Sequence, residues 1–378
     1  MIPVAKPSFK GNELKYVNKA IKEGWISSKS KYVVDFEELF SKKHDTKYGV
    51  ACSSGTNAIA LALKSLGIKE GDEVIVPEFT MIATAWAVSM TGATPVFVDC
   101  GLDLNINPSK IEDKITNKTK AIIPVHIYGR KCDMDKIMTI AYEYGLRVVE
   151  DSCEVHGVKP VGDIACYSLF GNKIITSGEG GICLTNDKYL AEQMEHLRGM
   201  AFNKEHTFLH KKFAWNFRMT GMQGAIALAQ TEKLDEFLKK RKQIESWYDD
   251  ELENFITKRQ NNAGELNSDI SLMPKRDVVW VYDIKVAARH RDELVSVLKE
   301  KGVETRVFFK PMSMQPMYKD YYEILYAYRA SMEGFYLPVF TDMTKKEVKY
   351  ICDIIKNYFK QKDGKNLQQT KPKTNKPK

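Results

Sequence analysis

The stretch YSLFGNKIITSGEGG spans residues 167–181 and holds one lysine, Lys173. The apolar run from Ile164 to Phe170 predicts a strand, and a Ser-Gly-Glu-Gly-Gly turn follows shortly after the lysine. Lysine side chains are normally solvated. An ammonium group between an apolar strand and glycine-rich backbone therefore indicates a chemical role for Lys173 rather than a surface charge.

A second candidate group lies upstream, at the end of another apolar run. Residues 146–150 predict a buried strand, and Asp151 ends it. An unpaired carboxylate in such a position costs several kcal/mol, so Asp151 needs a cationic partner. The alternative is that Asp151 caps a helix that begins at Ser152.

A third candidate is the segment SSGTNAIALAL, residues 53–63, where a small polar turn leads directly into a predicted helix. Free backbone N–H groups and hydroxyls at Ser54, Gly55 and Thr56 would converge at the positive end of the helix dipole. A phosphate dianion would be held there without a metal. Taken alone, the same residues are also a common helix N-cap.

Together, the three candidates match the needs of pyridoxal 5′-phosphate. This cofactor requires a lysine for a Schiff base, an acid for its pyridinium nitrogen and a helix N-terminus for its phosphate. Asp151 would keep the ring protonated and able to accept the electrons of a substrate carbanion. Lys173 would act first as nucleophile and then as carrier of a proton between substrate and cofactor.

The order of predicted elements indicates an α/β fold with two domains. Seven short, nearly continuous apolar runs alternate with helices, which predicts a mainly parallel seven-stranded sheet flanked by helices on both faces. Ligands of such sheets bind beyond the carboxyl ends of the strands, where the three candidate groups lie. The expected strands are 48–52, 73–77, 95–99, 121–126, 147–150, 164–168 and 182–185.

A long helical pattern over residues 222–255 predicts a bridge to a second domain. We expect a large cofactor-binding domain over residues 1–240 and a smaller α+β C-terminal domain over 241–360. Strands at 278–285 and 303–309 and helices at 291–300 and 345–359 would build the latter. Residues 361–378, rich in Lys, Gln, Asn and Pro, predict a disordered basic tail.

Charge and cysteine content argue against several classes of partner. The net charge of +8 is concentrated in the tail, so the folded body offers no basic surface for nucleic acid. The seven cysteines are widely spaced without a Cys-x-x-Cys pair, which favours reduced thiols over disulfides or a metal site. No signal peptide or membrane-spanning run is present. These features predict a cytoplasmic protein with no membrane, nucleic-acid or metal partner.

With these residues in view, the sequence resembles the sugar aminotransferases of the DegT/DnrJ/EryC1/StrS family, which are fold type I pyridoxal-phosphate enzymes. The resemblance covers nearly all of residues 1–360. Its landmarks are GWISS at 24, SSGTNAIALAL at 53, PEFTMIATA at 77, PVHIYGR at 124, VVEDSCEVHG at 148, SLFGNKIITSGEGG at 168, WNFRMTGMQGA at 215 and LPVFTDMT at 337.

The resemblance implies a role for each matching site residue. Lys173 would be the Schiff-base lysine and Asp151 the partner of the pyridine nitrogen, while Glu154 would lie near the ring hydroxyl. Asn216 resembles the residue that reaches across a dimer interface to the neighbouring phosphate, which implies a homodimer. The residues expected around the phosphate are Ser54, Gly55, Thr56 and Ser168.

The form FGNKxITxGEGG is most similar to perosamine synthases and viosamine-forming enzymes, which act on nucleotide-linked 4-keto-6-deoxyhexoses. On that model L-glutamate donates its amino group, and the pyridoxamine 5′-phosphate form then aminates C4 of the sugar. Met81 replaces an aromatic residue that many relatives stack on the cofactor ring, and Ser313 stands where relatives often have histidine. Expected substrate contacts are Trp25, Ser27, His126, Arg218 and Tyr318, with His126 equally interpretable as a hydrogen-bonded wall residue.

Three alternatives remain open from the sequence. The enzyme would transfer the amino group to C3, or would be a 3-dehydratase, although dehydratases of this family replace the lysine with histidine and Lys173 counts against that reading. A non-catalytic, cofactor-binding regulatory protein is the third alternative, and the combination of Asp151, Lys173 and Asn216 argues against it. The nucleotide, whether GDP, UDP or dTDP, is not determined by the sequence.

Overall fold

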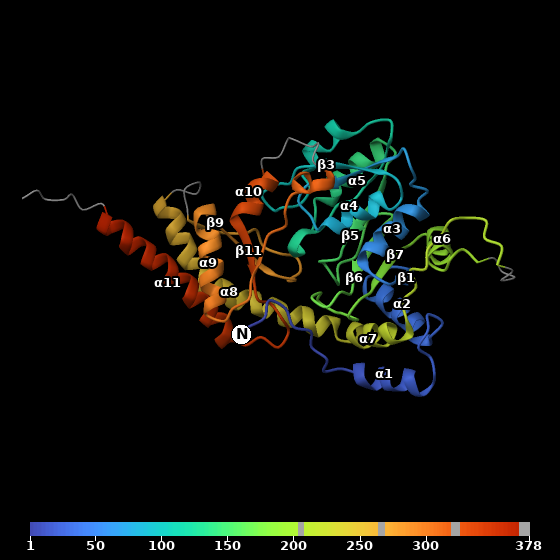
Figure 1. Cartoon of the computed structure of the whole chain (residues 1–378), viewed down its shortest axis with the longest axis horizontal. Coiled ribbons are helices and arrows are strands. Elements are labelled where there is room, and N and C mark those ends of the chain that lie inside the picture. The colour runs from blue at the N-terminus through green and yellow to red at the C-terminus, as the bar shows by residue number, and fades with distance from the viewer. Residues whose placement is uncertain (203–207, 264–268, 319–325, 370–378) are drawn as a thin grey trace, which may run out of the picture.

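The computed structural model of the chain describes residues 1–202, 208–263, 269–318 and 326–369 (Figure 1). Its centre is a seven-stranded sheet with the order β1-β7-β6-β5-β4-β2-β3. The strands are parallel except β7, which runs antiparallel to both of its neighbours. The strands are β1 (Tyr48–Cys52), β2 (Glu73–Pro77), β3 (Thr94–Val98), β4 (Thr119–Ile122), β5 (Arg147–Asp151), β6 (Ile164–Ser168) and β7 (Gly181–Thr185).

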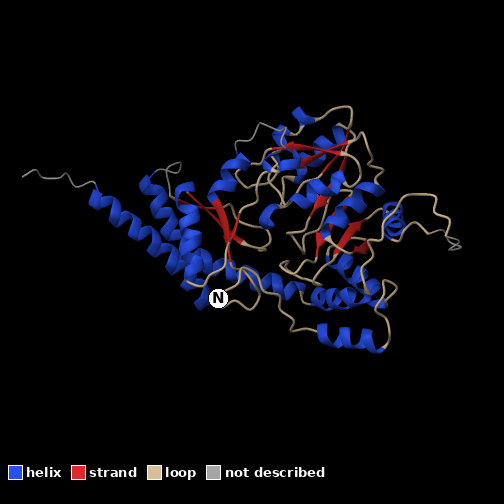
Figure 2. Cartoon of the chain, viewed as in Figure 1, coloured by secondary structure: helices blue, strands red, loops and turns tan. Residues whose placement is uncertain are grey.

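The sheet is buried on both faces, which confirms the predicted mainly parallel α/β fold. Val74 and Val76 of β2 point into a core that includes α3 and α4. Ile75, which lies between them, points into a second core with α5. This alternation explains why the strands read as continuous apolar runs. Figure 2 shows the strands surrounded by helices; four of these are α3 (Gly55–Ser65), α4 (Ile82–Ser89), α5 (Met134–Glu143) and α6 (Lys188–Arg198).

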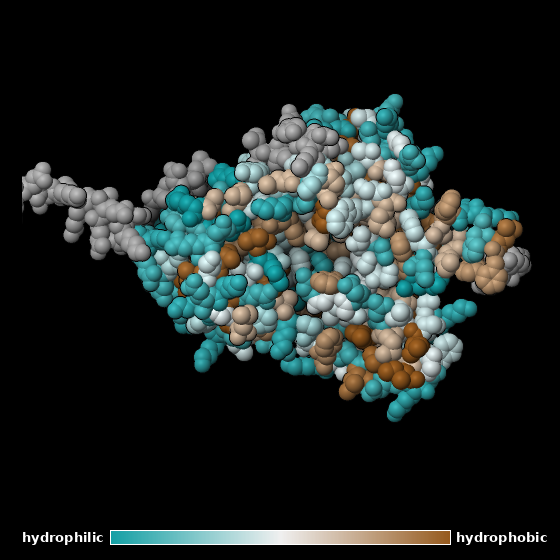
Figure 3. Space-filling model, in the orientation of Figure 1, coloured by the Kyte–Doolittle hydropathy of each residue, from teal (hydrophilic) through white to brown (hydrophobic). Residues whose placement is uncertain are grey.

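Three further helices pack together beside the sheet: α1 (Glu13–Lys22), α2 (Lys31–Lys43) and α7 (Gly221–Glu232). Thr220 and Gln223 form a capping box that starts α7. A space-filling view shows apolar side chains on the surface over α1 and α2 and over the loop that follows α6 (Figure 3). Exposed members of these two groups are Leu14, Ile21, Trp25, Ile26 and Val34, and Phe208, Leu209 and Phe213.

Helix α8 (Leu234–Ala263) connects the sheet to a second hydrophobic core. Its first turns contribute Leu234 and Phe237 to the main core, and Ile244 and Tyr248 belong to the second one. The domain boundary at residue 240 stays a prediction, and the change of core along α8 supports it. Ile2 packs against the second core and pairs with Val303, whereas Val4 packs against the main core, so the first residues contact both cores.

The second core is built on a four-stranded antiparallel sheet with the order β10-β11-β9-β8. Two of its strands, β8 and β11, and the helix α10 were not predicted, because they are short and lack a clear period. The elements are β8 (Ile270–Leu272), β9 (Tyr282–Val286), β10 (Arg306–Val307), β11 (Gly334–Leu337), α9 (Ala288–Glu300), α10 (Tyr326–Glu333) and α11 (Lys345–Gln369). The 3₁₀ turns among the described residues are η1 (Pro108–Lys110), η2 (Glu112–Lys114), η3 (Ile127–Gly129), η5 (Met312–Met314) and η6 (Pro316–Tyr318).

The predicted disordered tail begins later than expected. Helix α11 runs to Gln369, so the prediction was wrong for residues 361–369. Lys362 forms an ion pair with α9 and Asp363 one with α8, and these contacts hold the last described turns against their neighbours. Residues 370–378 lie outside the described part of the chain. Within the described ranges, no helix is long and apolar enough to cross a membrane.

A network of buried polar contacts joins the loop after β4 to the second core. The Arg130 guanidinium, in the loop after β4, donates to the carbonyl of Pro274 at 2.8 Å and to Asp283 Oδ1 at 2.9 Å. Arg276 also binds Asp283, and both guanidinium groups and the carboxylate are buried. Because a buried charge without a partner is costly, this network fixes how the loop after β4 meets the second core.

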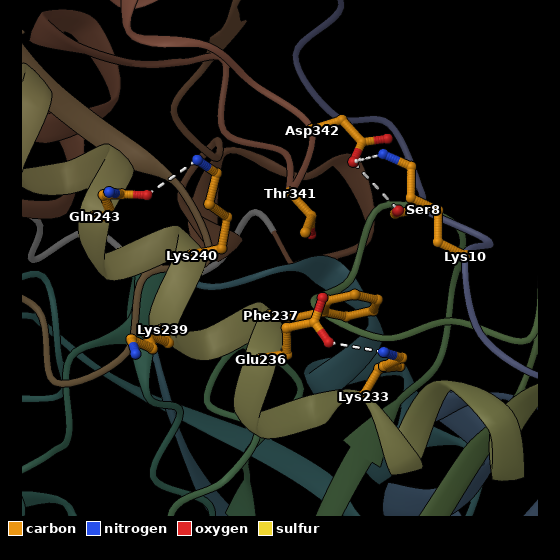
Figure 4. Close-up of a pocket in the computed structure, with 10 residues that line it drawn as sticks. All are labelled: Ser8, Lys10, Lys233, Glu236, Phe237, Lys239, Lys240, Gln243, Thr341 and Asp342. Carbon is orange, nitrogen blue, oxygen red and sulfur yellow. Dashed lines mark hydrogen bonds and ion pairs between the residues drawn. The ribbon is translucent and has the colours of Figure 1, made fainter.

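Ser8 and Lys10, in the segment before α1, line a surface pocket of about 410 Å³ together with α8 and the loop after β11 (Figure 4). Lys10 Nζ lies 2.6 Å from Asp342 Oδ1, and Lys233 Nζ lies 2.8 Å from Glu236 Oε2. The two lysines are therefore neutralised by carboxylates of the pocket wall, and these exposed pairs add little stability.

Candidate active site

The start of α3 lies against the end of β6 and forms a tight polar cradle. Ser54 is the N-cap of α3, and its hydroxyl accepts the Asn57 N–H at 3.2 Å. A Cβ at Gly55 would lie 2.7 Å from Ser168 Cβ, and a Cβ at Gly181 would lie 2.3 Å from the Ser54 carbonyl oxygen. Glycine is therefore required at both positions for the helix N-terminus to reach the strand ends.

This cradle fits a phosphate group. The positive end of α3, with Ser54, Gly55 and Thr56, faces the Ser168 hydroxyl where Gly55 packs against Ser168. Ser168 Oγ accepts the N–H of Phe170 at 3.3 Å, which leaves its own proton available for donation. The predicted phosphate residues are thus brought together by the contact between α3 and β6.

Asp151 ends β5 beside β6 and is buried. Its Oδ2 accepts a hydrogen bond from Thr84 Oγ1 at 2.8 Å, and its Oδ1 accepts one from the Cys153 N–H at 3.2 Å. No basic side chain forms an ion pair with Asp151 among the residues that the structure describes. Two neutral donors orient the carboxylate without neutralising it, so its environment fits a cationic ring nitrogen.

Lys173 lies in the turn between β6 and β7, and its N–H donates to the Phe170 carbonyl at 2.9 Å. The amine is not in open solvent, because its side chain is only 12% exposed. Nζ lies 3.9 Å from Glu154 Oε1 and 4.0 Å from the centre of the Trp280 ring. The amine is therefore held between a carboxylate that follows β5 and an aromatic face of the main hydrophobic core.

Glu154 is the buried acid nearest to Lys173. Burial raises the pKa of Glu154 to about 7, although the charge of Lys173 and a backbone hydrogen bond oppose this shift. That bond comes from the Tyr128 N–H, at 2.6 Å from Oε2. Tyr128 has a left-handed backbone with φ 52°, which is rare for a residue with a bulky side chain, and this conformation accompanies the contact with Glu154.

His126 is a wall residue, and the predicted substrate contact is wrong. Its side chain is buried, with Nε2 at 3.0 Å from Glu150 Oε2 and Nδ1 accepting the Cys132 N–H at 3.0 Å. Successive residues of a strand point to opposite faces, so Glu150 and its partner lie on the other side of the sheet from Asp151. Both ring nitrogens are occupied, and neither is left for a substrate.

Among the described residues, no hydrogen bond or ion pair joins the other predicted contacts to Lys173, Asp151 or Glu154. Ser27 and Arg218 line one hollow of about 580 Å³ beside α2 and α6. Trp25, two residues before Ser27, is half exposed, and Asn216, two residues before Arg218, is exposed. The Tyr318 hydroxyl forms a hydrogen bond of 3.0 Å with Ser89 Oγ, at the C-terminal end of α4. These contacts with substrate or partner therefore stay predictions.

Met81 is the N-cap residue of α4, the helix that carries Thr84, and it is 51% exposed. Its place beside the cofactor ring stays a prediction. Sequence reasoning did not identify Thr84, Tyr128 or Trp280, which contact Asp151, Glu154 and Lys173. The spacing of Thr84 within PEFTMIATA offered a weak signal, whereas nothing local to Trp280 indicates a contact with Lys173.

Comparisons with known proteins show the family of this chain. The model of the DegT/DnrJ/EryC1/StrS aminotransferase family matches residues 7–356. GDP-perosamine synthase of Escherichia coli O157:H7 is 38% identical over 371 residues, which cover 96% of this chain and 99% of that protein. GDP-perosamine synthase of Caulobacter vibrioides is 38% identical over 92% of this chain and 95% of that protein.

A solved structure gives the same fold. NtdA of Bacillus subtilis with bound cofactor PMP superimposes with a TM-score of 0.82 and 29% sequence identity, over 92% of this chain and 81% of that one. The family model covers most of the chain, and the two relatives match it over nearly their whole length. The chain belongs to the DegT/DnrJ/EryC1/StrS aminotransferase family.

Proposed function

We propose that this enzyme transfers the amino group of L-glutamate to C4 of a GDP-linked 4-keto-6-deoxyhexose, which gives a 4-amino-4,6-dideoxy sugar for glycan biosynthesis. The observation that carries the proposal is the similarity to GDP-perosamine synthases at 38% identity over almost the whole of both chains. An amino group at C4 and GDP as the nucleotide follow from what those relatives are named for.

Pyridoxal 5′-phosphate is the cofactor of this aminotransferase. When bound, it supplies an aldehyde that accepts an amino group and a ring that stores the electrons of a substrate carbanion. The cradle of α3 and Ser168 would hold its phosphate, and Asp151 would hold its ring nitrogen in the charged form. Glu154 would lie beside the ring hydroxyl.

Lys173 performs the acid–base work at the reacting carbon. Its amine lies 3.9 Å from Glu154 Oε1 and is largely buried. A single amine on this turn takes a proton from the substrate carbon of glutamate and returns one in the reverse direction on the sugar. Its low exposure keeps bulk water from competing for that proton.

A homodimer would complete the site. Asn216 is exposed, and its backbone forms a bridge with Gly199. Within the described part of the chain its side chain makes no hydrogen bond, which leaves it able to reach a second subunit. The apolar side chains over α1 and α2 and over the loop after α6 (Figure 3) form surfaces that a second copy would cover. The hollow lined by Ser27 and Arg218 opens beside these surfaces and would then face the site of the other subunit.

The proposal is tested by offering the purified protein L-glutamate with GDP-, UDP- and dTDP-linked 4-keto-6-deoxy sugars in turn. We expect 2-oxoglutarate and an aminated GDP-sugar whose nitrogen lies on C4 by NMR. An amine at C3, a dehydrated sugar, or no turnover with any acceptor would instead support the alternatives left open by the sequence.

The lysine is tested by Lys173→Ala, with Lys159→Ala as its control. Lys159 pairs with Asp45 on the surface, so its removal should leave turnover unchanged. Lys173→Ala should lose at least a thousandfold in turnover, because the proton carrier is gone. A Lys173→Ala protein that aminates the sugar at the parent rate would remove the proposed mechanism.

A further inference from the structure

Trp280 makes two contacts with the turn that carries Lys173. The centre of its ring lies 4.0 Å from Lys173 Nζ, well inside the range of a cation–π interaction. Its indole N–H donates to the carbonyl of Asn172 at 2.9 Å. One side chain thus touches the amine and also holds the peptide group directly before it.

The surroundings make the ring contact strong. Trp280 is 4% exposed and the Lys173 side chain 12%, so little water competes for the ammonium group. Tryptophan offers the best aromatic face for a cation, and desolvation increases the attraction. The other partner of the amine, Glu154, loses its charge near neutral pH because burial raises its pKa to about 7. The indole face stays attractive whether or not Glu154 is ionised.

The main hydrophobic core holds Trp280 in place. Arg241 NH1 donates to the Trp280 carbonyl at 3.0 Å, and the Tyr128 and Tyr336 rings lie 6.1 Å from the indole. The same segment is anchored to the main sheet by the Val278 N–H, which donates to the Gly129 carbonyl at 2.9 Å. The ring is therefore part of a packed core rather than a mobile loop.

We propose that Trp280 is a positioning residue, whose indole face holds the amine of Lys173 whenever the lysine is not joined to the cofactor. The inference rests on the proposed function, in which Lys173 must leave the cofactor and return to it in every cycle. A long, flexible side chain released into the site would otherwise sample many rotamers. Trp280 keeps the amine beside Glu154, where it can carry its proton and react again.

The test measures how fast the cofactor-free protein bonds to added pyridoxal 5′-phosphate, without any turnover. The amine adds to the aldehyde carbon with loss of water, and borohydride then delivers hydride to the new C=N bond. Peptide mass spectrometry locates and counts the reduced adduct on Lys173 over time. The variants are Trp280→Leu, which removes ring and N–H, and Trp280→Phe, which keeps a ring but loses the N–H.

The chain offers a matched control in Trp247. Its ring lies 4.4 Å from Lys240 Nζ on α8, which is the same kind of pair away from the site. We expect Trp280→Leu to slow adduct formation at Lys173 at least tenfold, Trp280→Phe about threefold, and Trp247→Leu less than twofold. Unfolding midpoints of all three are measured in urea alongside.

The outcomes separate this inference from the proposed function. Adduct formation at the parent rate in Trp280→Leu would overturn the positioning role, whatever happens to the unfolding midpoint. If that variant does not fold, Trp280→Phe decides, and a parental rate there overturns the role. A parent protein that forms no adduct at Lys173 would instead refute the proposed function, because the lysine itself would be misassigned.

Discussion

Replacing Gly55 with alanine tests the phosphate cradle directly. The new Cβ would lie 2.7 Å from Ser168 Cβ and 3.1 Å from Cys153 Sγ. Carbon atoms in contact normally lie about 3.5–4.0 Å apart, so α3 and the end of β6 must separate by about 1 Å. Overpacking of this kind costs about 1–3 kcal/mol. Part of the strain in the folded state is offset by about 0.4–1 kcal/mol, because alanine reduces the entropy of the unfolded chain.

The separation weakens cofactor binding more than folding. A phosphate held from both sides loses contacts when one side moves, whereas the free protein can relax. At about 1.4 kcal/mol for each tenfold change in affinity, we expect Gly55→Ala to bind pyridoxal 5′-phosphate roughly 5- to 100-fold more weakly. The assay is an absorbance titration of the cofactor-free protein, with urea unfolding measured in parallel.

The control is Gly171→Ala, in the turn before Lys173, where an added Cβ would meet no atom within 4 Å. Its affinity for the cofactor should stay within about twofold of the parent, because no neighbour has to move. Equal affinities for Gly55→Ala and Gly171→Ala would refute the reasoning. A loss of unfolding midpoint in Gly55→Ala with unchanged affinity would do the same, since the strain would then fall outside the phosphate site.

Two further predictions concern stability. Arg130→Met should lower the free energy of unfolding, measured in urea, by about 3–5 kcal/mol, because buried Asp283 then keeps one guanidinium partner fewer. The control is Arg147→Met, in an ion pair whose arginine is 60% exposed, which should cost less than about 1 kcal/mol. Similar losses in the two variants would contradict this prediction. Burial lowers the pKa of His44 to about 4, and its Nε2 accepts the Gly157 N–H at 2.8 Å. The folded state therefore binds fewer protons than the unfolded state, in which histidine titrates near about 6.5, so stability should fall as pH drops from about 6.5 to about 4. Unfolding midpoints at several pH values should show a shallower fall for His44→Gln, and an unchanged slope would argue against this assignment.

The local pattern of residues was enough to predict the sheet and the centre of the site. Each of the seven strands is a short apolar run, and burial on both faces leaves that signature in the sequence itself. Lys173, Asp151 and the start of α3 are each marked by their own neighbours, a glycine-rich turn, a strand end and a small polar cap. Because parallel strands end at one edge of a sheet, their convergence also follows from the order of elements.

Two predictions were wrong, and both errors have one physical origin. His126 follows a strand end, as a site residue would. Its neighbours in the sequence do not reveal that its Nε2 is hydrogen-bonded to Glu150 on the opposite face of the sheet. Residues 361–369 have a composition typical of disorder, and the helix persists there because its ion pairs are with α8 and α9. In both cases the deciding partner lies far away in the chain.

Short-range spacing was therefore sufficient to predict the seven strands of the main sheet, the family and the reacting groups. The distant side chains that complete the site became apparent only from the packing in three dimensions. Thr84 contacts Asp151, and Trp280 contacts Lys173, although the members of each pair lie far apart in the chain. The packing that brings them together is a sum over many weak interactions that no single stretch of residues encodes.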